Sequence, residues 1–310
     1  MKKYLVYLFA VIILAGCGQA QPAAPSTPAV STEPVAITST PTVQPSVTPA
    51  FVLTPMSSEL PTAEAYFDGV RVTYVGNSGF LITAGDNKIL IDALFDGFGG
   101  IYYLPDDVYT LLVDAQPPFD NIDLILITHD HGDHFSADPV RQYMQTNPTV
   151  VLVSNEQVTS QLAEFGDRVI TLNATDGNPD FVEVGNIQVE GIYLSHGAVP
   201  TGEIEIINYG YIVTVNDVSF FHTGDMDGDM YSDSDLRAYG LPEMDLDFAF
   251  ITHFLLSTPY TNSLINTGID SRYIIASHYQ YTEAPDPVRI QQFFRGTVFF
   301  DSEMESWVMP

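Results

Sequence analysis

A mostly apolar run that ends in a cluster of histidines and aspartates constrains this chain more than any other feature. Residues 122–127 read Ile-Asp-Leu-Ile-Leu-Ile, and residues 128–135 read Thr-His-Asp-His-Gly-Asp-His-Phe. A short apolar run followed by polar residues and glycine predicts a buried strand that ends where a loop begins. Three of the seven histidines in the chain therefore lie together at one predicted strand end.

The side chains of this cluster have the chemistry of metal ligands. Imidazole is a borderline-soft nitrogen ligand and carboxylate is a hard oxygen ligand, so together, without cysteine, they suit zinc or another first-row divalent ion. A solvated polar loop can hold one or two histidines by chance, but three at such close spacing favour a metal site. We therefore predict that residues 128–135 form part of a metal site.

The N-terminus reads as an export signal. Lys2 and Lys3 precede an unbroken apolar stretch, residues 4–14, which is too short to span a bilayer comfortably. The stretch ends in Leu-Ala-Gly-Cys, which resembles the bacterial lipobox, where the chain is cut before the cysteine and the cysteine is lipidated. The alternatives are a plain secretory signal with an incidental cysteine, or a short membrane anchor. We predict that residues 1–16 are a signal peptide and that lipidated Cys17 anchors the protein to a membrane in the cell envelope, outside the cytoplasm.

The rest of the chain divides by composition into a linker and one domain. Residues 17–64 are rich in proline, serine, threonine, alanine and valine, and such a segment buries too little apolar surface to offset its ordering entropy. We predict a disordered spacer there. Residues 65–310 are long enough for one domain with a sizeable core. Since Cys17 is the only cysteine, the chain forms no intramolecular disulfide.

The charge balance excludes one class of partner. The chain has 10 lysines and arginines against 39 aspartates and glutamates, a formal net charge of −29. A surface of this sign repels phosphate backbones, so nucleic acid is not an expected substrate. Most of the acidic residues are interpreted as a solvated surface that serves solubility.

The order of β-rich and helical patterns predicts a mixed α/β domain. Strands are predicted at residues 70–75, 80–83, 88–91, 122–127, 150–153, 169–172, 181–184, 187–194, 206–215, 218–222, 246–252 and 273–277. Helices are predicted at residues 102–115, with a start after Pro105 as the alternative, and at residues 137–146 and 156–165.

The remaining histidines occur at the ends of predicted strands. They are His196, His222, His253 and His278. Strand ends on one edge of a sheet converge on a common crevice, which is where ligands bind in such folds. A single histidine after a strand is more often a capping or core residue. Several at equivalent places, in a chain that already has a metal cluster, favour further ligands.

The order of these residues resembles the metallo-β-lactamase superfamily, and the resemblance extends from Val70 onward. The order is His129-x-His131-x-Asp133-His134, then His196, then Asp225 in a Thr-Gly-Asp turn, then His278. Residues 117–128 also resemble the branch that includes ascorbate-phosphate lactonase-like hydrolases and N-acyl-phosphatidylethanolamine phospholipase D. The resemblance implies an α/β fold of four layers, an αββα sandwich with a dinuclear site at one edge of its two sheets. Periodicity alone predicts only a mixed α/β protein.

The resemblance also implies a ligand set for two divalent ions, with zinc expected and manganese or iron as alternatives. His129, His131 and His196 would hold the first ion. Asp133, His134 and His278 would hold the second, and Asp225 would bridge both. Two such ions share a bridging hydroxide that acts as the nucleophile, and they polarise the scissile carbonyl or phosphoryl oxygen. Asp133 would also orient this nucleophile.

Three other residues have weaker assignments. His253 follows a strand that should end near the site, where it would protonate a leaving group or serve as a hydrogen-bonded, non-catalytic histidine. His222 is interpreted as a core or supporting residue. Asp92 is interpreted as a partner that orients a ligand histidine, or as a support of the fold. Asp133 and His253 are therefore the catalytic candidates.

These features together predict a membrane-anchored, extracytoplasmic, metal-dependent hydrolase that acts on a small-molecule or lipid substrate. Lactones, phosphodiesters, amides and thioesters all stay open as substrates, and the oligomeric state is not predicted. The alternatives are a non-enzymatic metal- or solute-binding lipoprotein and a di-iron redox protein on the same fold. The complete ligand set argues against the first alternative. The histidine-rich pattern, with no attached flavin-binding domain, argues against the second.

Overall fold

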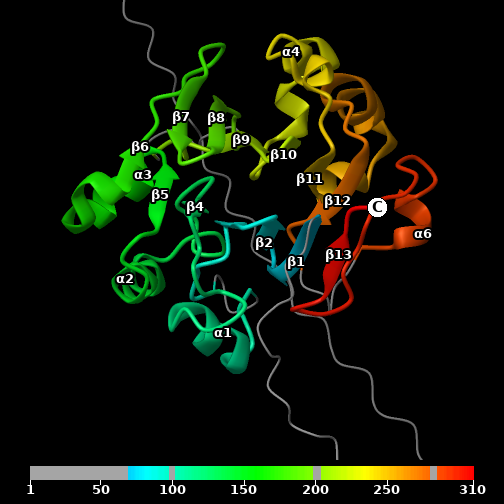
Figure 1. The fold of residues 1–310 in the computed structure, drawn as a ribbon. Coiled ribbons are helices and arrows are strands. Elements are labelled where there is room, and N and C mark those ends of the chain that lie inside the picture. The colour runs from blue at the N-terminus through cyan, green and yellow to red at the C-terminus, as the bar shows by residue number, and fades with distance from the viewer. Residues whose placement is uncertain (1–68, 98–101, 198–203, 280–284) are drawn as a thin grey trace, which may run out of the picture. The chain divides into compact units, whose positions relative to one another are not determined.

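The computed structural model describes residues 69–97, 102–197, 204–279 and 285–310. The predicted signal peptide, Cys17 and the linker at residues 17–64 lie outside the described residues. Within them the chain forms two mixed β-sheets flanked by helices, so the predicted sandwich of helices and two sheets is confirmed (Figure 1). No helix among the described residues is both long enough and apolar enough to cross a membrane.

The first sheet begins as an antiparallel meander and continues as parallel strands. Its spatial order is β13-β1-β2-β3-β4-β5-β6. Its strands are β1 (Val70–Gly76), β2 (Gly79–Ala84), β3 (Asn87–Ile91), β4 (Leu124–Leu126), β5 (Val151–Ser154), β6 (Val169–Thr171) and β13 (Ser306–Val308). Strands β3 to β6 run parallel, so their carboxyl ends, including the end of β4 that carries the histidine cluster, lie at one edge.

The second sheet has the spatial order β12-β11-β10-β9-β8-β7. Its strands are β7 (Asp180–Val184), β8 (Ile187–Tyr193), β9 (Tyr209–Val215), β10 (Val218–His222), β11 (Phe248–Thr252) and β12 (Tyr273–Ser277). Strands β7 to β10 are antiparallel, and β10 to β12 are parallel. The ends of β10, β11 and β12 therefore also share one edge.

Helices cover the outer faces of both sheets. Figure 1 shows α1 (Asp106–Val113) and α2 (Ala137–Thr146) beside the first sheet, and α4 (Asp233–Arg237) beside the second. One apolar cluster fills the space between the sheets, where the Phe80 and Phe250 rings lie 4.4 Å apart. Two further clusters lie under the helices, one on each outer face. Full burial of such an aromatic side chain contributes about 1.5–3 kcal/mol, so this packing determines how the sheet edges meet.

Several element boundaries differ from the predictions. The predicted helix 156–165 is instead α3 (Glu156–Thr159) followed by the 3₁₀ segment η1 (Ser160–Arg168), because the backbone leaves helical geometry at Leu162 and at Gly166, where φ is +57°. For the predicted helix 102–115 the alternative start after Pro105 is confirmed, because proline has no N–H for a preceding turn, and the helix ends at Val113. The strand predicted from residue 206 begins at Tyr209.

The structure also contains elements that were not predicted. They are β13 and a series of short helices: η2 (Gly228–Met230), α4, η3 (Leu241–Met244), α5 (His253–Leu256), η4 (Pro259–Thr261), η5 (Leu264–Ile269, a π-helix) and α6 (Pro287–Ile290). Each is three to six residues long, which is too short for an apolar period to show in the sequence.

Candidate metal centre

The loop after β4 presents the first histidine cluster as a compact turn. The backbone N–H groups of His134 and Phe135 both donate to the carbonyl oxygen of His131, at 3.0 and 2.9 Å. His129 and His134 are fully buried, and Asp133 is nearly so. The turn therefore holds these side chains at the edge of the first sheet with little freedom to move.

The second sheet contributes the other residues of the centre, each from the end of a strand. His196 follows β8, Asp225 follows β10 and His278 follows β12. His278 has a left-handed backbone, with φ of +61°, and its N–H donates to the carbonyl oxygen of Asn77 at 3.0 Å. This hydrogen bond joins the end of β12 to the β1–β2 turn of the first sheet.

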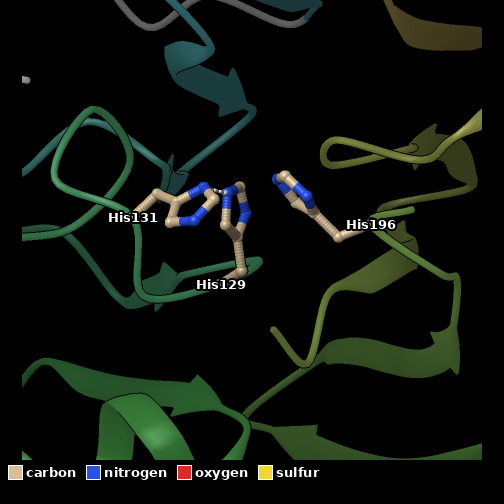
Figure 2. Close-up of side chains that lie close together, drawn as sticks. All are labelled: His129, His131 and His196. Carbon is tan, nitrogen blue, oxygen red and sulfur yellow. Dashed lines mark hydrogen bonds between the residues drawn. The ribbon is translucent and has the colours of Figure 1, made fainter. Parts of the chain in front are cut away.

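His129, His131 and His196 form a first group of candidate ligands. One nitrogen atom from each ring lies within 4.8 Å of the other two. Nε2 of His129 lies 3.2 Å from Nδ1 of His131. Figure 2 shows the His196 ring approaching the other two from the opposite side.

Asp133, His134 and His278 form a second group with the same compactness. Oδ2 of Asp133 lies 3.3 Å from Nε2 of His278 and 3.8 Å from Nε2 of His134. Unlike the first group, this one combines two imidazoles with a carboxylate. The set is therefore harder, because it includes a carboxylate oxygen.

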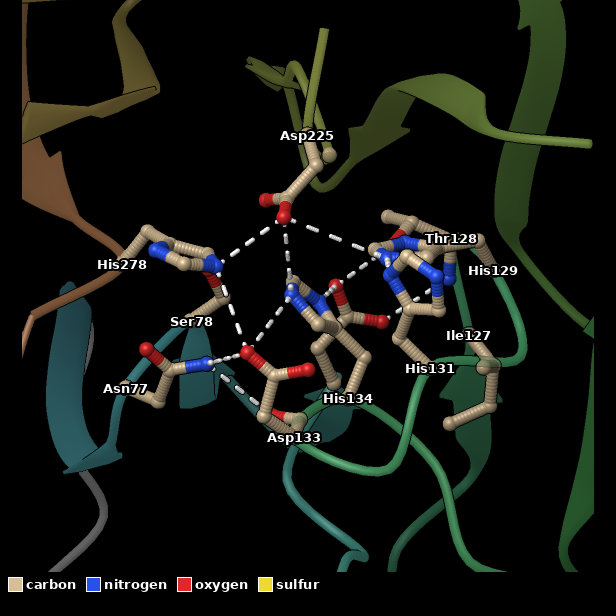
Figure 3. Close-up of polar contacts among 12 residues, drawn as sticks. Asn77, Ser78, Ile127, Thr128, His129, His131, Asp133, His134, Asp225 and His278 are labelled. Atoms are coloured by element: carbon tan, nitrogen blue, oxygen red, sulfur yellow. Dashed lines mark hydrogen bonds and ion pairs between the residues drawn. The ribbon is translucent and has the colours of Figure 1, made fainter. Parts of the chain in front are cut away.

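Asp225 lies between the two groups (Figure 3). Its Oδ2 is 2.9 Å from Nε2 of His278 and 3.4 Å from Nε2 of His134, both in the second group. The same oxygen is 3.6 Å from Nε2 of His196 and 3.9 Å from Nε2 of His129, both in the first group. One carboxylate oxygen thus faces both groups of candidate ligands.

This donor set fits divalent metal ions. Four buried polar atoms of the candidate ligands have no hydrogen-bond partner: Nε2 of His134, Nε2 of His196, Nδ1 of His278 and Oδ1 of Asp225. A buried polar atom without a partner costs about 1–3 kcal/mol, so such a concentration is expected where a ligand completes the site. Imidazole nitrogens with carboxylate oxygens suit zinc and similar ions. The structure thus brings together all seven residues that the sequence predicts as metal ligands.

Two rings of the first group, those of His129 and His131, are neutral near neutral pH. Burial lowers the pKa of His129 well below its ordinary value, and the neighbouring histidines lower it further. Burial also lowers the pKa of His131, and the nearby His196 lowers it further. Neutral imidazoles are the form that binds metal ions.

The second group is charged in the absence of metal. Burial would lower the pKa of His134, but the carboxylates of Asp225 and Asp92 outweigh burial and raise it well above its ordinary value. At His278 burial lowers the pKa, but the carboxylates of Asp225 and Asp133 outweigh burial and raise the pKa to about 9. In return His134 and His278 hold the pKa of Asp225 well below its usual range, against the effect of burial.

Asp92 orients two neighbours of the centre at once. One of its oxygens lies 2.8 Å from Nδ1 of His134 and accepts the Thr128 hydroxyl at 2.6 Å. The other oxygen accepts the Thr128 backbone N–H at 2.8 Å, and the Thr128 hydroxyl lies 3.0 Å from Nδ1 of His129. Asp92 therefore turns the Nε2 atom of His134 toward Asp225, which is the supporting role expected of it.

Asn77 is a supporting residue that sequence reasoning missed. Its side-chain NH₂ donates to Oδ2 of Asp133 at 3.2 Å and to the Asp133 carbonyl oxygen at 3.0 Å. The sequence shows only a Gly-Asn-Ser-Gly turn at residues 76–79, with no sign that the turn meets the other sheet. Asparagine tolerates the left-handed φ of +51° at this position, which is the one local signal.

His222 belongs to neither ligand group but supports the centre through two hydrogen bonds to its backbone neighbours. Its Nε2–H donates to the carbonyl oxygen of Ser78 at 3.3 Å, and its Nδ1 accepts the Gly224 N–H at 3.0 Å. Burial lowers its pKa to about 4, so the ring is neutral. The contacts connect the β1–β2 turn to the backbone just before Asp225.

His253 lies beside the centre rather than in it. It begins α5, and its ring centroid is 6.4 Å from that of His278. Its Nδ1 is buried and has no hydrogen-bond partner, and burial lowers its pKa. It belongs to neither ligand group, so its predicted catalytic role stays a prediction.

Comparisons with known proteins add to this geometry. A family model described as the beta-lactamase superfamily domain matches residues 71–244, more than half of the chain. A UPF0173 metal-dependent hydrolase of Pyrococcus furiosus is 29% identical over 214 residues, which cover 68% of this chain and 84% of that protein. YtkL of Bacillus subtilis, also named a UPF0173 metal-dependent hydrolase, is 26% identical over 216 residues, which cover 68% of this chain and 86% of YtkL.

A solved structure shows the same fold. Igni18, a metallo hydrolase from the archaeon Ignicoccus hospitalis, superposes with a TM-score of 0.57 at 16% sequence identity, covering 78% of this chain and 98% of that chain. The segment matched by the family model contains every candidate ligand except His278, which follows at the end of β12. The chain therefore belongs to the beta-lactamase superfamily.

Proposed function

We propose that this protein is a metal-dependent hydrolase whose centre holds two divalent ions, most simply zinc. The observation that carries the proposal is the position of Asp225, whose Oδ2 lies within 3.9 Å of nitrogen atoms from both ligand groups. A negatively charged oxygen shared in this way offsets the repulsion between two cations. The names of the UPF0173 relatives support the same activity.

The residues of the chain divide the chemical work. Bound divalent ions would supply a hydroxide nucleophile near neutral pH and polarise the bond to be cut. Asp133, held by the Asn77 amide, accepts a hydrogen bond from the attacking nucleophile and orients it. Asp92 and Thr128 keep the rings of His134 and His129 in their orientations. The burial of the centre limits competition from bulk water.

We assign protonation of the leaving group to His253. Its ring lies beside His278, and its unpartnered Nδ1 is the atom that would carry the proton. Since burial lowers the pKa of His253, the protonated form exists only under acidic conditions. The His253→Gln variant should therefore lose most activity relative to the parent at acidic pH. A loss that is equal at every pH would refute this role.

We also propose that the hydrolase works in the cell envelope, tethered by lipid on Cys17. The lipobox-like end of the apolar N-terminal stretch and the proline-rich segment at residues 17–64 support this proposal. Labelled fatty acid should attach to the parent chain and not to the Cys17→Ser variant. Equal labelling of both would contradict the tether.

Two measurements on the full chain test the proposed hydrolase. Metal analysis of protein prepared without chelator should find close to two ions per chain, and one or none would rule out the dinuclear centre. Turnover should then be sought with lactones, thioesters, amides and phosphodiesters, including an N-acyl phosphatidylethanolamine because of the resemblance at residues 117–128. Iron with a visible charge-transfer band, and no hydrolysis, would instead favour redox chemistry.

The Asp133→Ala variant tests the role of the orienting carboxylate. It should abolish turnover of any substrate found while the far-UV circular dichroism stays that of the parent. Asp167→Ala is the matched control, because Asp167 is an exposed aspartate in η1. Turnover that survives in Asp133→Ala would show that the mechanism above is wrong.

A further inference from the structure

A cavity of about 420 Å³ opens directly on the metal centre. Two candidate ligands, His196 and Asp225, form part of its wall. The other lining residues are Met226, Asp227, Gly228, Asp229, Phe254, Leu255, Thr258 and Thr261. A group held in this cavity would therefore lie next to any bond cut at the centre.

One wall of the cavity is apolar and includes an exposed aromatic ring. Phe254 is 41% exposed, although its neighbour Leu255 is buried in the outer core. The Phe254 ring centroid lies 5.5 Å from that of His278. The cavity thus extends from His196, a ligand of the first group, to Phe254, whose ring contacts His278 of the second group.

The charged residues of the cavity all carry the same sign. Asp227 and Asp229 supply carboxylates, and no lysine or arginine is among the described residues that line it. Asp227 is fixed in place, because its Oδ1 accepts the Asp229 N–H at 3.0 Å. Its Oδ2 lies only 3.1 Å from the position that a Cβ of Gly197 would occupy, so the glycine admits this carboxylate beside His196.

A second cavity, of about 750 Å³, is lined in part by Gly197 and also combines carboxylates with aromatic rings. Its wall contains three tyrosines, Tyr193, Tyr231 and Tyr239. Their hydroxyls bond to Glu205, to the Ser195 N–H and to the Gly177 N–H, so the rings are held as walls. Asp176, Glu205 and Asp235 add carboxylates, and again no lysine or arginine is among the described lining residues.

We propose that the substrate of this centre carries a positively charged ammonium group, which binds in the 420 Å³ cavity between His196 and Phe254. This inference rests on the proposed hydrolase function and names its substrate class. An organic ammonium is attracted both by carboxylates and by the face of an aromatic ring. A negatively charged group in the same place would meet two carboxylates and no cation from the chain. The net charge of −29 also produces a long-range field that attracts cations.

The test compares two thioesters of the same shape on the full, zinc-loaded chain. Acetylthiocholine and 3,3-dimethylbutyl thioacetate differ only in the quaternary atom, nitrogen in the first and carbon in the second. In both, the acyl C–S bond breaks, water supplies hydroxide to the acyl carbon, and the sulfur leaves as thiol after taking up the other proton of water. We expect kcat/KM to be about tenfold higher for the cationic thioester, the size expected of one cation–π contact with charge attraction.

Variants of the cavity should remove this preference. In Asp227→Asn, whose amide oxygen still caps the 3₁₀ turn η2, the ratio of the two kcat/KM values should fall several-fold toward one. Phe254→Leu should lower the ratio as well. Asp167→Asn changes the net charge equally at an exposed position outside both cavities, and it should leave the ratio unchanged.

A binding measurement separates this inference from the proposed function. Saturation-transfer NMR compares choline with 3,3-dimethylbutan-1-ol on the same zinc-loaded chain. Choline binding without any thioester turnover would support the cation site and count against thioester hydrolysis. Turnover of both thioesters at equal efficiency would keep the hydrolase and overturn the cation site. Absence of choline binding would overturn the cation site whether or not the thioesters turn over, and absence of thioester turnover would count against thioester hydrolysis alone.

Discussion

The two groups of candidate ligands differ in charge although they face the same carboxylate. In the first group, burial lowers the pKa values of His129 and His131, so both rings are neutral. In the second group, carboxylates raise the pKa values of His134 and His278, so both rings hold protons. The first ion therefore binds to rings that are already neutral. The second ion must displace the protons from the two rings that bind it.

Distance to carboxylates explains the difference, since burial acts in the same direction on both groups. Oδ2 of Asp225 is 2.9 Å from Nε2 of His278 but 3.9 Å from Nε2 of His129. Asp92 lies 2.8 Å from Nδ1 of His134 and Asp133 lies 3.3 Å from Nε2 of His278, so the second group has two more carboxylates in close contact. The residues around a histidine cluster thus determine whether its rings are neutral or protonated before a metal ion binds.

The largest expected effect comes from deleting one ligand from each group. His196→Ala should lose the ion of the first group, and His278→Ala the ion of the second, with turnover falling by more than about 100-fold in both. The estimate is a lower bound, because the loss of a supporting hydrogen bond alone costs about 10–100-fold. Metal content per chain and turnover should be measured together. If either variant lost both ions, the two groups would have to be treated as one site.

The pH dependence of metal affinity should separate the groups next. His278, with its pKa raised to about 9, is protonated below that pH and must lose the proton to bind metal. Affinity for the second ion should thus fall at least about 100-fold from pH 9 to pH 7, because His278 alone contributes about tenfold per pH unit and the proton on His134 adds to this. Affinity for the first ion should change little over this range. Chelator competition at several pH values measures both, and equal slopes would contradict the comparison.

The raised pKa of His278 also makes the stability of the metal-free protein depend on pH. A raised folded-state pKa stabilises the fold fully below the ordinary histidine pKa, and this contribution is lost as pH rises through about 9. His222 acts in the opposite sense. Its pKa is lowered to about 4, so its contribution is present above the ordinary value and is lost as pH falls toward 4.

The loop that carries the histidine cluster could be predicted because its signals are local. The apolar run and the close spacing of ligands lie within fourteen residues, and β4 appears inside the predicted strand. The β9–β10 hairpin was equally legible, since Asn216 and Asp217 adopt the left-handed φ values of +49° and +62° that their residue types tolerate. Local turn chemistry thus located much of the first and second sheets.

Contacts between distant segments could not be predicted in the same way. Strand β13 forms only because residues near the C-terminus pair with β1, and nothing within those three residues indicates a partner. Asn77 reaches Asp133 only because the β1–β2 turn meets the loop after β4. His222 ends β10 and His253 directly follows β11, yet His222 is buried and bonded to Ser78 while His253 begins α5. Tertiary packing decides such cases.

The support of the second group by Asp92 should have the third largest effect. Asp92→Asn weakens the acceptor of the His134 Nδ1–H, so affinity for the second ion should fall about 10–100-fold. The first ion should be affected less, through Thr128 alone. Asp123→Asn is the matched control, because that carboxylate also accepts a backbone N–H, from Lys88, among residues remote from the ligands. Equal losses in the two variants would remove Asp92 from the account.

The smallest effect should come from Asn77. Asn77→Asp places a second carboxylate about where the amide stands 3.2 Å from Oδ2 of Asp133, and its negative charge should raise affinity for the second ion about tenfold. Asn77→Gly keeps the left-handed backbone and only removes the donor, so the loss should be about threefold. Asn216→Gly, at a similar φ of +49° in the β9–β10 turn, controls for backbone effects. Calorimetric titration at one pH compares all three.

The arrangement of ligands on two separate sheets has a consequence for the lifetime of the protein. His129 to His134 follow a strand of the first sheet, whereas His196, Asp225 and His278 follow strands of the second. An ion bound by both sets is a cross-link between the two sheets, and at a free concentration 1,000 times its dissociation constant it stabilises the fold by about 4 kcal/mol. Metal starvation would therefore open the boundary between the sheets to proteases. Metal supply thus governs how long the protein survives as well as whether it acts.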